Sequence, residues 1–552
     1  MLDTLLPFIP LIAVFILLVF AIWVARKSPG GSNHIGPMAM FVGLAGLVSA
    51  VLSFIVVWNT GTLHTPLLGT EGLGFSLRLD TLSMTMFTMI ALLGFVILKF
   101  SNNYLDGDAR KGIFFRRLAV TVVSVELLVL SGNLFQLLTF WIITSICLHY
   151  LLTFYKSRPQ AIGAARKKFI VARIGDFSLL MATALIYREL GTGELVVIFD
   201  RISEMATLST TLIGATIFMV IAAVLKSAQF PTHGWLIEVV ETPTPVSALL
   251  HAGLLNAGPF LMVRMGFLMI ESTPASIMLI IIGGFTALFA SVVYLTQPTI
   301  KIALGYSSVA HMGFSLLICG FGVHTAAILH VVAHSFYKAH SFLSSGSVID
   351  AVRARRISLP KRQGSFIRIV LSIAFAMGVY TLACFMWGIS PDENYNLMII
   401  GAIIVMGISQ VIVATLDTKG NFEAILASMG IGLIVALSFF TLENQAGLLL
   451  ATQLPIEQEP ALIIKMAATA VILIYALVVL TQLMAPRLKR NTITYQLGVH
   501  LRNGLYVNVL FDRMIGSLKN EKFKWINLTV QEEQDNLRDY SKEINKAPTV
   551  NQ

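Results

Sequence analysis

Charged residues are scarce in this chain: Asp, Glu, Lys and Arg make up 12% of its 552 residues, whereas hydrophobic residues make up 56%. A soluble protein of this size would need far more polar surface. Cysteine is scarcer still, since Cys147, Cys319 and Cys384 lie far apart in apolar stretches. The sequence therefore contains no readable disulfide framework or cysteine metal site. An HExxH metal motif is also absent.

Long apolar runs take the place of the missing charge. Windows of about 20 residues, the length of a helix that crosses a bilayer, identify about fifteen spans. They lie near 5–25, 37–58, 80–100, 113–131, 134–155, 168–188, 210–229, 243–271, 275–296, 301–322, 325–348, 365–388, 396–416, 421–442 and 461–484. The first run is too long, and too poor in a small-residue cleavage site, for a removable signal peptide. We therefore predict an all-α polytopic membrane protein.

Basic residues in alternate loops predict the orientation. They follow spans 1, 3, 5 and 11, and include Lys167 and Lys168 after span 5, whereas the intervening loops are short or acidic. Because Lys and Arg mark the cytoplasmic side, we expect the N-terminus outside and the tail inside. The net charge of +10 is then mostly topological. Nucleic-acid binding is not expected, because the basic residues form no single stripe.

The chain divides into two predicted parts. No linker interrupts residues 1–484, which we interpret as one membrane domain, and residues 485–552 have the composition of a soluble tail. In the tail, residues 504–518 are amphipathic and residues 525–546 are strongly polar. A solvated or frayed tail is the simpler expectation. A cytoplasmic tail is also a candidate contact for a soluble partner.

The segment from Lys226 to His251 combines two features that are rare at membrane depth. Lys226 closes an apolar helix, Pro231 breaks it, and a Pro-Thr-Pro run opens the apolar helix that contains His251. Titratable groups inside a bilayer usually face a partner, a cavity or an ion path. Broken helices are tolerated there only where they are buried in protein or line a wet cavity. The segment therefore indicates ion movement, although Lys226 could instead extend to the membrane interface.

A second group of titratable residues occupies one apolar span. His330, His334 and Lys338 are spaced i, i+4, i+8, which places them on one helical face over about 12 Å. Such groups can relay protons through bound water, since histidine titrates near neutrality and desolvation brings lysine into that range. His311 and His340 lie off this stripe. The alternatives are histidines bonded to backbone carbonyls, or a zinc site that would lack a nearby Cys, Asp or Glu ligand.

Four acidic residues are candidate supports for a cationic path. Asp176 lies three residues after Arg173, so the two can pair on one helical face, and a simple ion pair is the favoured interpretation. Glu238 and Glu241 follow the helix break and are interpreted as interfacial caps of the next span. Glu126 lies in an apolar span, where it either faces the interior or points to the interface.

The segments KSAQFPTHGW and ETPTPVSALLHAG resemble the signature of the proton-translocating subunits of respiratory complex I and the related Mrp antiporters. The resemblance continues through QPTIKIALGYSSVAHMGF and HVVAHSFYKAHSFLSSGSVI, weakly through ARIGDFSLLMA, and covers roughly residues 120–350. It implies 14–15 transmembrane helices, with two inverted five-helix repeats and broken helices in an antiporter-like core at about 113–420. It also implies an ion path through the matching Lys226, His251, His330, His334 and Lys338.

The sequence departs from that family in three places. The family has Trp-Glu in its fifth helix, where the glutamate partners the broken-helix lysine, but here Trp141 is followed by Ile142. The later lysine of the family has no counterpart in residues 367–394. We also expect no long lateral helix, as the complex I subunit has, in the residues up to Gln552. We expect another acid to compensate near Lys226, with Asp176 as the first candidate and Glu126 as the second.

This divergent pattern looks most similar to the DabB family, the membrane subunits of the DAB complexes that accumulate dissolved inorganic carbon. The resemblance implies a bacterial inner-membrane location and a cytoplasmic partner, DabA, similar to a β-type carbonic anhydrase with its own zinc. Flow of H+ or Na+ would energise CO2 hydration to bicarbonate on that partner. This chain would then be neither an enzyme nor a cofactor carrier. The rival is a proton-translocating subunit of a complex I-like enzyme or an Mrp-type antiporter, and a stand-alone metabolite transporter is less favoured.

Overall fold

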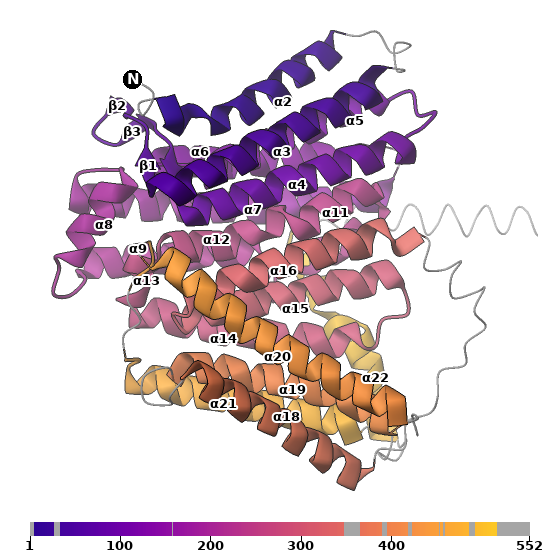
Figure 1. Cartoon of the computed structure of the whole chain (residues 1–552). Coiled ribbons are helices and arrows are strands. Elements are labelled where there is room, and N and C mark those ends of the chain that lie inside the picture. Colours follow the sequence, from indigo (N-terminus) through magenta and orange to yellow (C-terminus); the bar gives the residue numbers. More distant parts are fainter. Residues whose placement is uncertain are drawn as a thin grey trace, which may run out of the picture.

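A computed structural model describes residues 5–26, 34–156, 158–346, 365–388, 395–417, 422–451, 453–455, 459–484 and 492–515. Most of these residues are helical, and Figure 1 shows the long helices side by side with their axes in roughly one direction. The prediction of an all-α polytopic membrane protein is confirmed. The basic loop after span 11 and the tail beyond residue 515 lie outside the described residues.

The chain passes through the bundle nearly in sequence order, from one end to the other (Figure 1). The first helices are α2 (Pro10–Ala25), α3 (Ile35–Thr60), α4 (Thr81–Tyr104), α5 (Lys111–Val129), α6 (Leu134–Leu152), α7 (Pro159–Leu190), α8 (Leu195–Ser203) and α9 (Thr210–Lys226). The middle helices are α10 (Gly234–Glu238), α11 (Thr244–Ala252), α12 (Ala257–Arg264), α13 (Gly266–Ile270), α14 (Thr273–Tyr294), α15 (Ile300–Gly320) and α16 (His324–Leu343). The last are α18 (Phe366–Trp387), α19 (Tyr395–Asp417), α20 (Phe422–Leu450), α21 (Leu462–Met484), α22 (Thr492–Arg502) and α23 (Val507–Ile515).

The predicted spans correspond to helices. Within the described residues, twelve helical segments are long and apolar enough to cross a membrane, one of them running from α11 through α12. Helices α5, α9 and α16 coincide with the three remaining predicted spans. The arrangement of these helices in inverted repeats stays a prediction. Helix α20 crosses the bundle obliquely and contacts α16 and α4, so it ties the last helices to the middle of the chain (Figure 1).

Two short β-hairpin pairings join α3 to α4, and the sequence analysis did not predict them. Strand β1 (Leu63–His64) pairs antiparallel with β4 (Arg78–Leu79), and β2 (Leu68–Thr70) pairs antiparallel with β3 (Leu73–Phe75). The turn between β2 and β3 is Glu71-Gly72, with φ of 52° and 80°. A two-residue hairpin of the tightest kind requires positive φ at both positions, which glycine adopts without strain.

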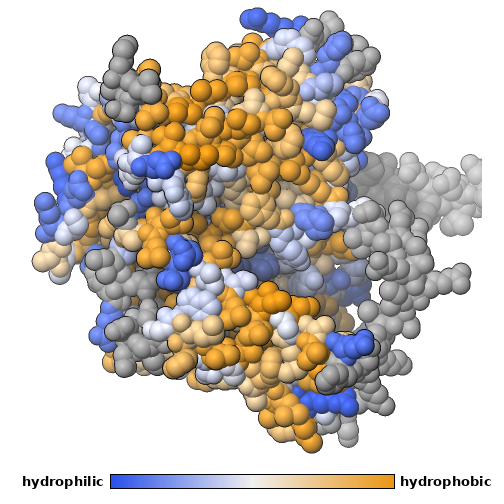
Figure 2. Space-filling view, viewed as in Figure 1, coloured by the Kyte–Doolittle hydropathy of each residue, from blue (hydrophilic) through white to orange (hydrophobic). Residues whose placement is uncertain are grey.

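Apolar side chains cover the flank of the bundle. Figure 2 shows hydrophobic residues spread over the sides of the helices, with hydrophilic residues gathered near the helix ends. Phe15, Phe41 and Phe385 are among the most exposed, at 67%, 67% and 85%. An exposed apolar surface of this extent marks an interaction site, and on a polytopic helical bundle it fits contact with lipid.

Side-chain caps begin three of the helices that frame the site. Asp80 caps α4 by accepting from the Ser83 backbone at 2.8 Å, and Asn133 caps α6 by accepting from Gln136 at the same distance. Ser209 caps α9, the helix that ends in Lys226, by accepting from Leu212 at 3.3 Å. Each cap satisfies a backbone N–H that the first helical turn leaves unpaired.

Asp80 is also the centre of a buried ion network. Its carboxylate accepts from Arg264 at 2.5 and 3.0 Å and from Arg78 at 2.6 Å, and its side chain is fully buried. Burial alone would raise the pKa of this carboxyl, but the two guanidinium groups hold the pKa well below its usual range. The network fastens the start of α4 to the end of α12.

We expect Asp80→Ala to destabilise the protein by roughly 3–5 kcal/mol, because it leaves two buried guanidinium groups without a counter-charge. The measurement is the midpoint of thermal unfolding of the purified protein in detergent. Asp106→Ala is the control, since the Asp106 side chain is 88% exposed in its contact with Lys111, and it should cost less than about 1 kcal/mol. Equal midpoints for the two variants would contradict a structural role for the network.

Candidate functional site

The site is built around the helix break that the sequence predicted. Helix α9 ends at Lys226, and helical structure resumes at Gly234 in α10. Polar groups in the break find partners on neighbouring elements: Ser227 donates its hydroxyl to the Leu255 carbonyl at 2.9 Å, and the Phe230 backbone donates to Thr286 at 3.2 Å. Ser227, Ala228 and Gln229 in the break are buried in protein, as an irregular backbone at membrane depth requires, whereas Pro231 is exposed.

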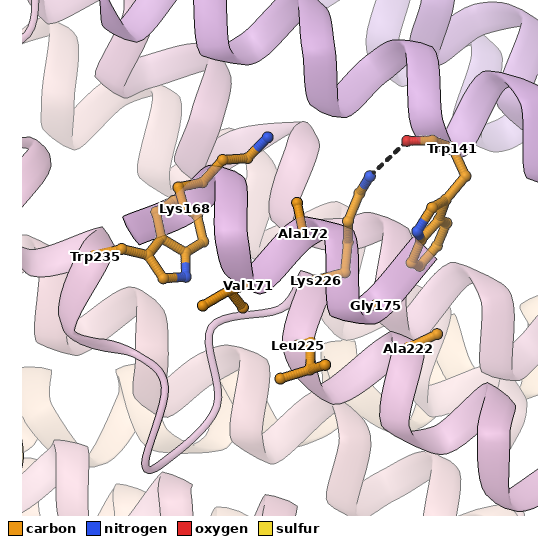
Figure 3. A pocket seen from close by; sticks show the side chains of 9 residues that line it. All are labelled: Trp141, Lys168, Val171, Ala172, Gly175, Ala222, Leu225, Lys226 and Trp235. Carbon is orange, nitrogen blue, oxygen red and sulfur yellow. Dashed lines mark hydrogen bonds between the residues drawn. The ribbon is translucent and has the colours of Figure 1, made fainter. Parts of the chain in front are cut away.

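Lys226 turns towards α6 instead of extending along its own helix. Its Nζ donates to the backbone oxygen of Trp141 at 2.9 Å and to the hydroxyl of Ser145 at 2.7 Å. The ammonium group also lies 4.4 Å from the centroid of the Trp141 indole ring. Figure 3 shows the lysine from α9 pointing at this carbonyl. These contacts argue against an interfacial Lys226.

A second lysine shares the site, and the sequence analysis missed it. Lys168 donates its Nζ to the backbone oxygen of Ser145 at 2.6 Å, and both lysines line a cavity of about 20 Å³ together with Trp141 and Trp235 (Figure 3). We assigned Lys168 to a basic cytoplasmic loop, and that assignment is wrong. Helix α7 begins at Pro159, so Lys168 lies in its third turn and is 4% exposed.

Among the candidate acids, Asp176 is placed to act on both lysines. It forms the expected ion pair with Arg173, at 2.6 Å, and it also interacts electrostatically with Lys226 and Lys168. Glu126 is fully buried, and neither of its carboxylate oxygens has a hydrogen bond in the described part of the chain. Neither residue occupies the place of the missing fifth-helix glutamate on α6, and their roles stay predictions.

Glu238 and Glu241 do not cap the next helix, which corrects that interpretation. Helix α11 has Pro243 at its N-cap and no side-chain cap. Glu238 instead accepts from Lys167 at 2.5 Å and from Asn508 at 2.6 Å. Glu241 contributes its backbone oxygen to Arg158. The interpretation failed because the partners of Glu238 come from distant parts of the chain.

A second lysine site lies between α15 and α16. Lys338 donates to the backbone oxygen of Leu304 at 3.3 Å and to the hydroxyl of Ser307 at 2.7 Å. Its two acceptors lie about one turn apart on the neighbouring helix, as those of Lys226 do. Both lysines are thus held in the same way by a neighbouring helix, and the inverted repeats implied by the family resemblance stay a prediction.

Histidines surround this second lysine. His330 and His334 face α15, where the Nε2 atom of His330 lies 3.3 Å from Nδ1 of His311, and the His311 and His334 rings are 5.2 Å apart. His251 on α11 stacks on Phe342 at 4.2 Å and interacts electrostatically with Lys338. The structure thus brings His251, His330, His334 and Lys338 together.

His311 belongs to this cluster, so its placement off the stripe is corrected. The stripe was defined on one helix, and His311 reaches it from another. His340 is exposed, as a residue off the stripe should be. No group of three or more His, Cys, Asp or Glu side chains in the described residues is arranged to hold a metal ion.

The tail packs against the site instead of lying free in solvent, at least over residues 492–515. Asp512 on α23 is 2% exposed and pairs with Lys167 of α7. Asn508 reaches Glu238 on α10, and Gln297 donates to the Arg502 backbone at 3.1 Å. The expectation of a solvated tail is wrong for the face that carries Asn508 and Asp512, whereas most other side chains of residues 495–514 are exposed or half-buried. Residues 485–491 and 516–552 lie outside the described part.

Family models match most of this core. Residues 131–361 match the transmembrane domain of the NADH:quinone oxidoreductase/Mrp antiporter family, and residues 68–115 match the N-terminal domain of complex I chain 5. The likeness to two solved structures shows the same fold. They are the Mrp complex from Dietzia sp. (TM-score 0.59, 20% identity, 96% of this chain and 63% of that one) and an archaeal membrane-bound sulfane sulfur reductase (TM-score 0.56, 19% identity, 92% and 99%).

Curated relatives are more similar in sequence. A probable inorganic carbon transporter subunit DabB2 of Halothiobacillus neapolitanus is 37% identical over 80% of each chain. A probable subunit DabB of Hydrogenovibrio crunogenus is 33% identical over 67% of this chain and 70% of its own. NADH-quinone oxidoreductase subunit L of Escherichia coli is 36% identical over 62% of this chain and 56% of its own.

Proposed function

Because the chain belongs to the DabB branch of the NADH:quinone oxidoreductase/Mrp antiporter membrane subunits, we propose that its ion flow energises the conversion of CO2 to bicarbonate on a partner protein. The chain itself is a cation-translocating membrane subunit and not a catalytic enzyme. The ion in the proposal is H+ or Na+, and the location is the bacterial inner membrane with the tail on the cytoplasmic side.

One observation carries the proposal: two lysines, the half-buried Lys226 and the fully buried Lys338, are each held by a carbonyl and a serine of a neighbouring helix. An amine in such a place can bind and release a proton, and its partners are neutral oxygens that do not fix the charge. The helix break beside Lys226 and the histidines beside Lys338 add further polar groups at membrane depth. Intramembrane groups of this kind mark ion paths.

The partner in this proposal is a DabA-like cytoplasmic protein that carries a zinc site similar to that of a β-type carbonic anhydrase. Two considerations support a separate partner. The relatives are named as subunits, and no hydratase ligand set is readable in this sequence. A complex I-like or Mrp-type antiporter subunit is the alternative. The replacement of the family glutamate by Ile142 counts against that alternative, because antiporter-type subunits use this glutamate beside the lysine.

The energy available is sufficient for the coupling. A single charge that crosses about 100 mV releases about 2.3 kcal/mol. At about 1.4 kcal/mol per factor of ten, one ion can shift a hydration equilibrium by more than about tenfold. Such coupling requires a partner whose site responds to the state of the membrane subunit and stays closed to the back-reaction.

We expect an uncoupler to stop the accumulation of labelled inorganic carbon in a carbonic-anhydrase-deficient host that expresses this chain with its partner. The uptake should fall to that of cells that carry the empty vector, and the membrane chain alone should give no accumulation. A protonophore and a sodium ionophore, applied separately, identify the ion. Continued accumulation after the membrane potential, the pH gradient and the sodium gradient have all been collapsed would contradict the proposal.

A further inference from the structure

Lys168 and Lys226 both form hydrogen bonds with Ser145, one with its backbone and the other with its side chain. Ser145 accepts from Lys226 through its hydroxyl, at 2.7 Å, and from Lys168 through its backbone oxygen, at 2.6 Å. In Figure 3 the two side chains come from α7 and α9 and both extend towards α6. The two ammonium groups therefore meet at a single turn of α6.

The charges at this turn do not balance when both lysines are protonated. The two ammonium groups repel each other, and Asp176 acts on both but is already paired with Arg173. In the place of the family glutamate, α6 offers Ile142. Two close cations repel each other more strongly in a low-dielectric site than in water. The pair therefore holds one positive charge more readily than two.

The cavity between the lysines has room for about one water molecule. Its volume is about 20 Å³, and Trp235 lines it along with both lysines. The Trp235 indole nitrogen is buried and has no hydrogen-bond partner among the described residues. A buried N–H donor without an acceptor is costly, and a bridging water would supply that acceptor while contacting the lysines.

We propose that Lys168 is a second relay residue of the ion path and passes protons to and from Lys226, an inference that rests on the proposed ion translocation. In this step one N–H bond of the Lys168 ammonium breaks and its proton moves to the cavity water. That water gives a proton to the unprotonated amine of Lys226, where a new N–H bond forms. The reverse transfer restores the first state, and no other reactant is consumed.

The residue before Lys168 belongs to a group of polar side chains that reaches the surface. Lys167, the next residue along α7, pairs with Glu238 and with Asp512 of the docked tail. The Glu238 side chain is 21% exposed, whereas the side chains of Lys167 and Asp512 are each 4% exposed. Glu238 is thus the member of this polar group that reaches solvent, and the group lies one residue along α7 from Lys168.

The test uses the full-length protein, with any subunits that co-purify, in liposomes that contain a pH-sensitive dye. A potassium gradient with valinomycin imposes the membrane potential. Lys168→Gln retains an N–H donor for the Ser145 carbonyl but cannot carry a proton, and Lys168→Arg retains the charge but does not release its proton. We expect both variants to lower the rate of proton uptake on the order of tenfold or more. Lys99→Gln, at an exposed position of α4, should leave the rate unchanged.

A structural role for Lys168 predicts a different pattern. If the lysine only fastens α7 to α6, Lys168→Arg or Lys168→Gln should keep the wild-type rate of proton uptake and its dependence on pH. Such a result, or a wild-type rate in both variants, would overturn the relay. A parallel assay with a sodium-sensitive dye covers the other candidate ion: a wild-type protein that takes up sodium but no protons would overturn the relay alone, and one that takes up neither ion would overturn the proposed function.

Discussion

Lys226→Ala should abolish inorganic-carbon accumulation while leaving the protein in the membrane. The substitution removes the group that bonds the Trp141 carbonyl and the Ser145 hydroxyl, and with it the proposed proton carrier at the helix break. Loss of a proton-transfer group lowers a rate by factors on the order of 100 or more in enzymes, and we expect a similar loss here. The measurement is growth in air of a carbonic-anhydrase-deficient host that also expresses the partner, together with the amount of the chain in its membranes.

Lys226→Arg separates a relay from a fixed charge. Arginine keeps the positive charge and the donor groups, but it cannot give up its proton, so this variant should also fail. Lys99→Arg and Lys99→Ala make the same changes at an exposed position on α4 and should support normal growth. Full growth of the Lys226→Arg strain would show that a fixed charge suffices at this site.

The helices could be predicted from the sequence because a bilayer imposes one dominant rule. A span must be apolar for about 20 residues, so hydropathy locates it even when its packing is unknown. The break after Lys226 was predictable for a similar reason, since Pro231 cannot continue a helix. The short β-hairpins between α3 and α4 carry no comparable signal: their strands are two or three residues long.

Lys168 was missed as a site residue because a hydropathy rule assigns basic residues to loops. Arg166, Lys167 and Lys168 form a basic run, and basic runs mark loops in a hydropathy window. Pro159 at the start of α7 was the signal that could have found it, because proline is common at the first helical positions. A helix that starts there places Lys167 and Lys168 inside the domain, where Glu238 and Asp512 neutralise Lys167, and leaves Arg166 exposed.

Contacts between distant segments account for the remaining differences between the predictions from the sequence and the structure. The i, i+4, i+8 spacing identifies one face of α16, but it says nothing of the helix opposite, which contributes His311. The amphipathic pattern of residues 504–518 likewise shows that a helix has two faces without showing what either face meets. In the structure Asn508 and Asp512 face protein, whereas Leu510 and Met514 are 56% and 83% exposed. Polar pairs inside the bundle thus decide which face is docked.

The pairing of α15 with α16 leads to an expectation for four histidine and lysine variants. Lys338→Ala and His334→Ala should lower ion-driven uptake on the order of tenfold or more, and should lower assembly with the partner much less. His311→Ala should behave in the same way, because its ring lies 5.2 Å from the His334 ring and its Nδ1 atom lies 3.3 Å from His330. His340→Ala is the matched control, since His340 lies on α16 two residues from Lys338 but is exposed.

Uptake of labelled inorganic carbon, divided by the amount of complex recovered by affinity purification through a tag on the chain, separates transport from assembly. A relay requires the three variants inside the cluster to lose uptake per complex while His340→Ala keeps it. Equal losses in all four variants would mean that the cluster has no special part in ion movement. A loss confined to Lys338→Ala would assign the path to the two lysine sites and leave the histidines as packing groups between α11, α15 and α16.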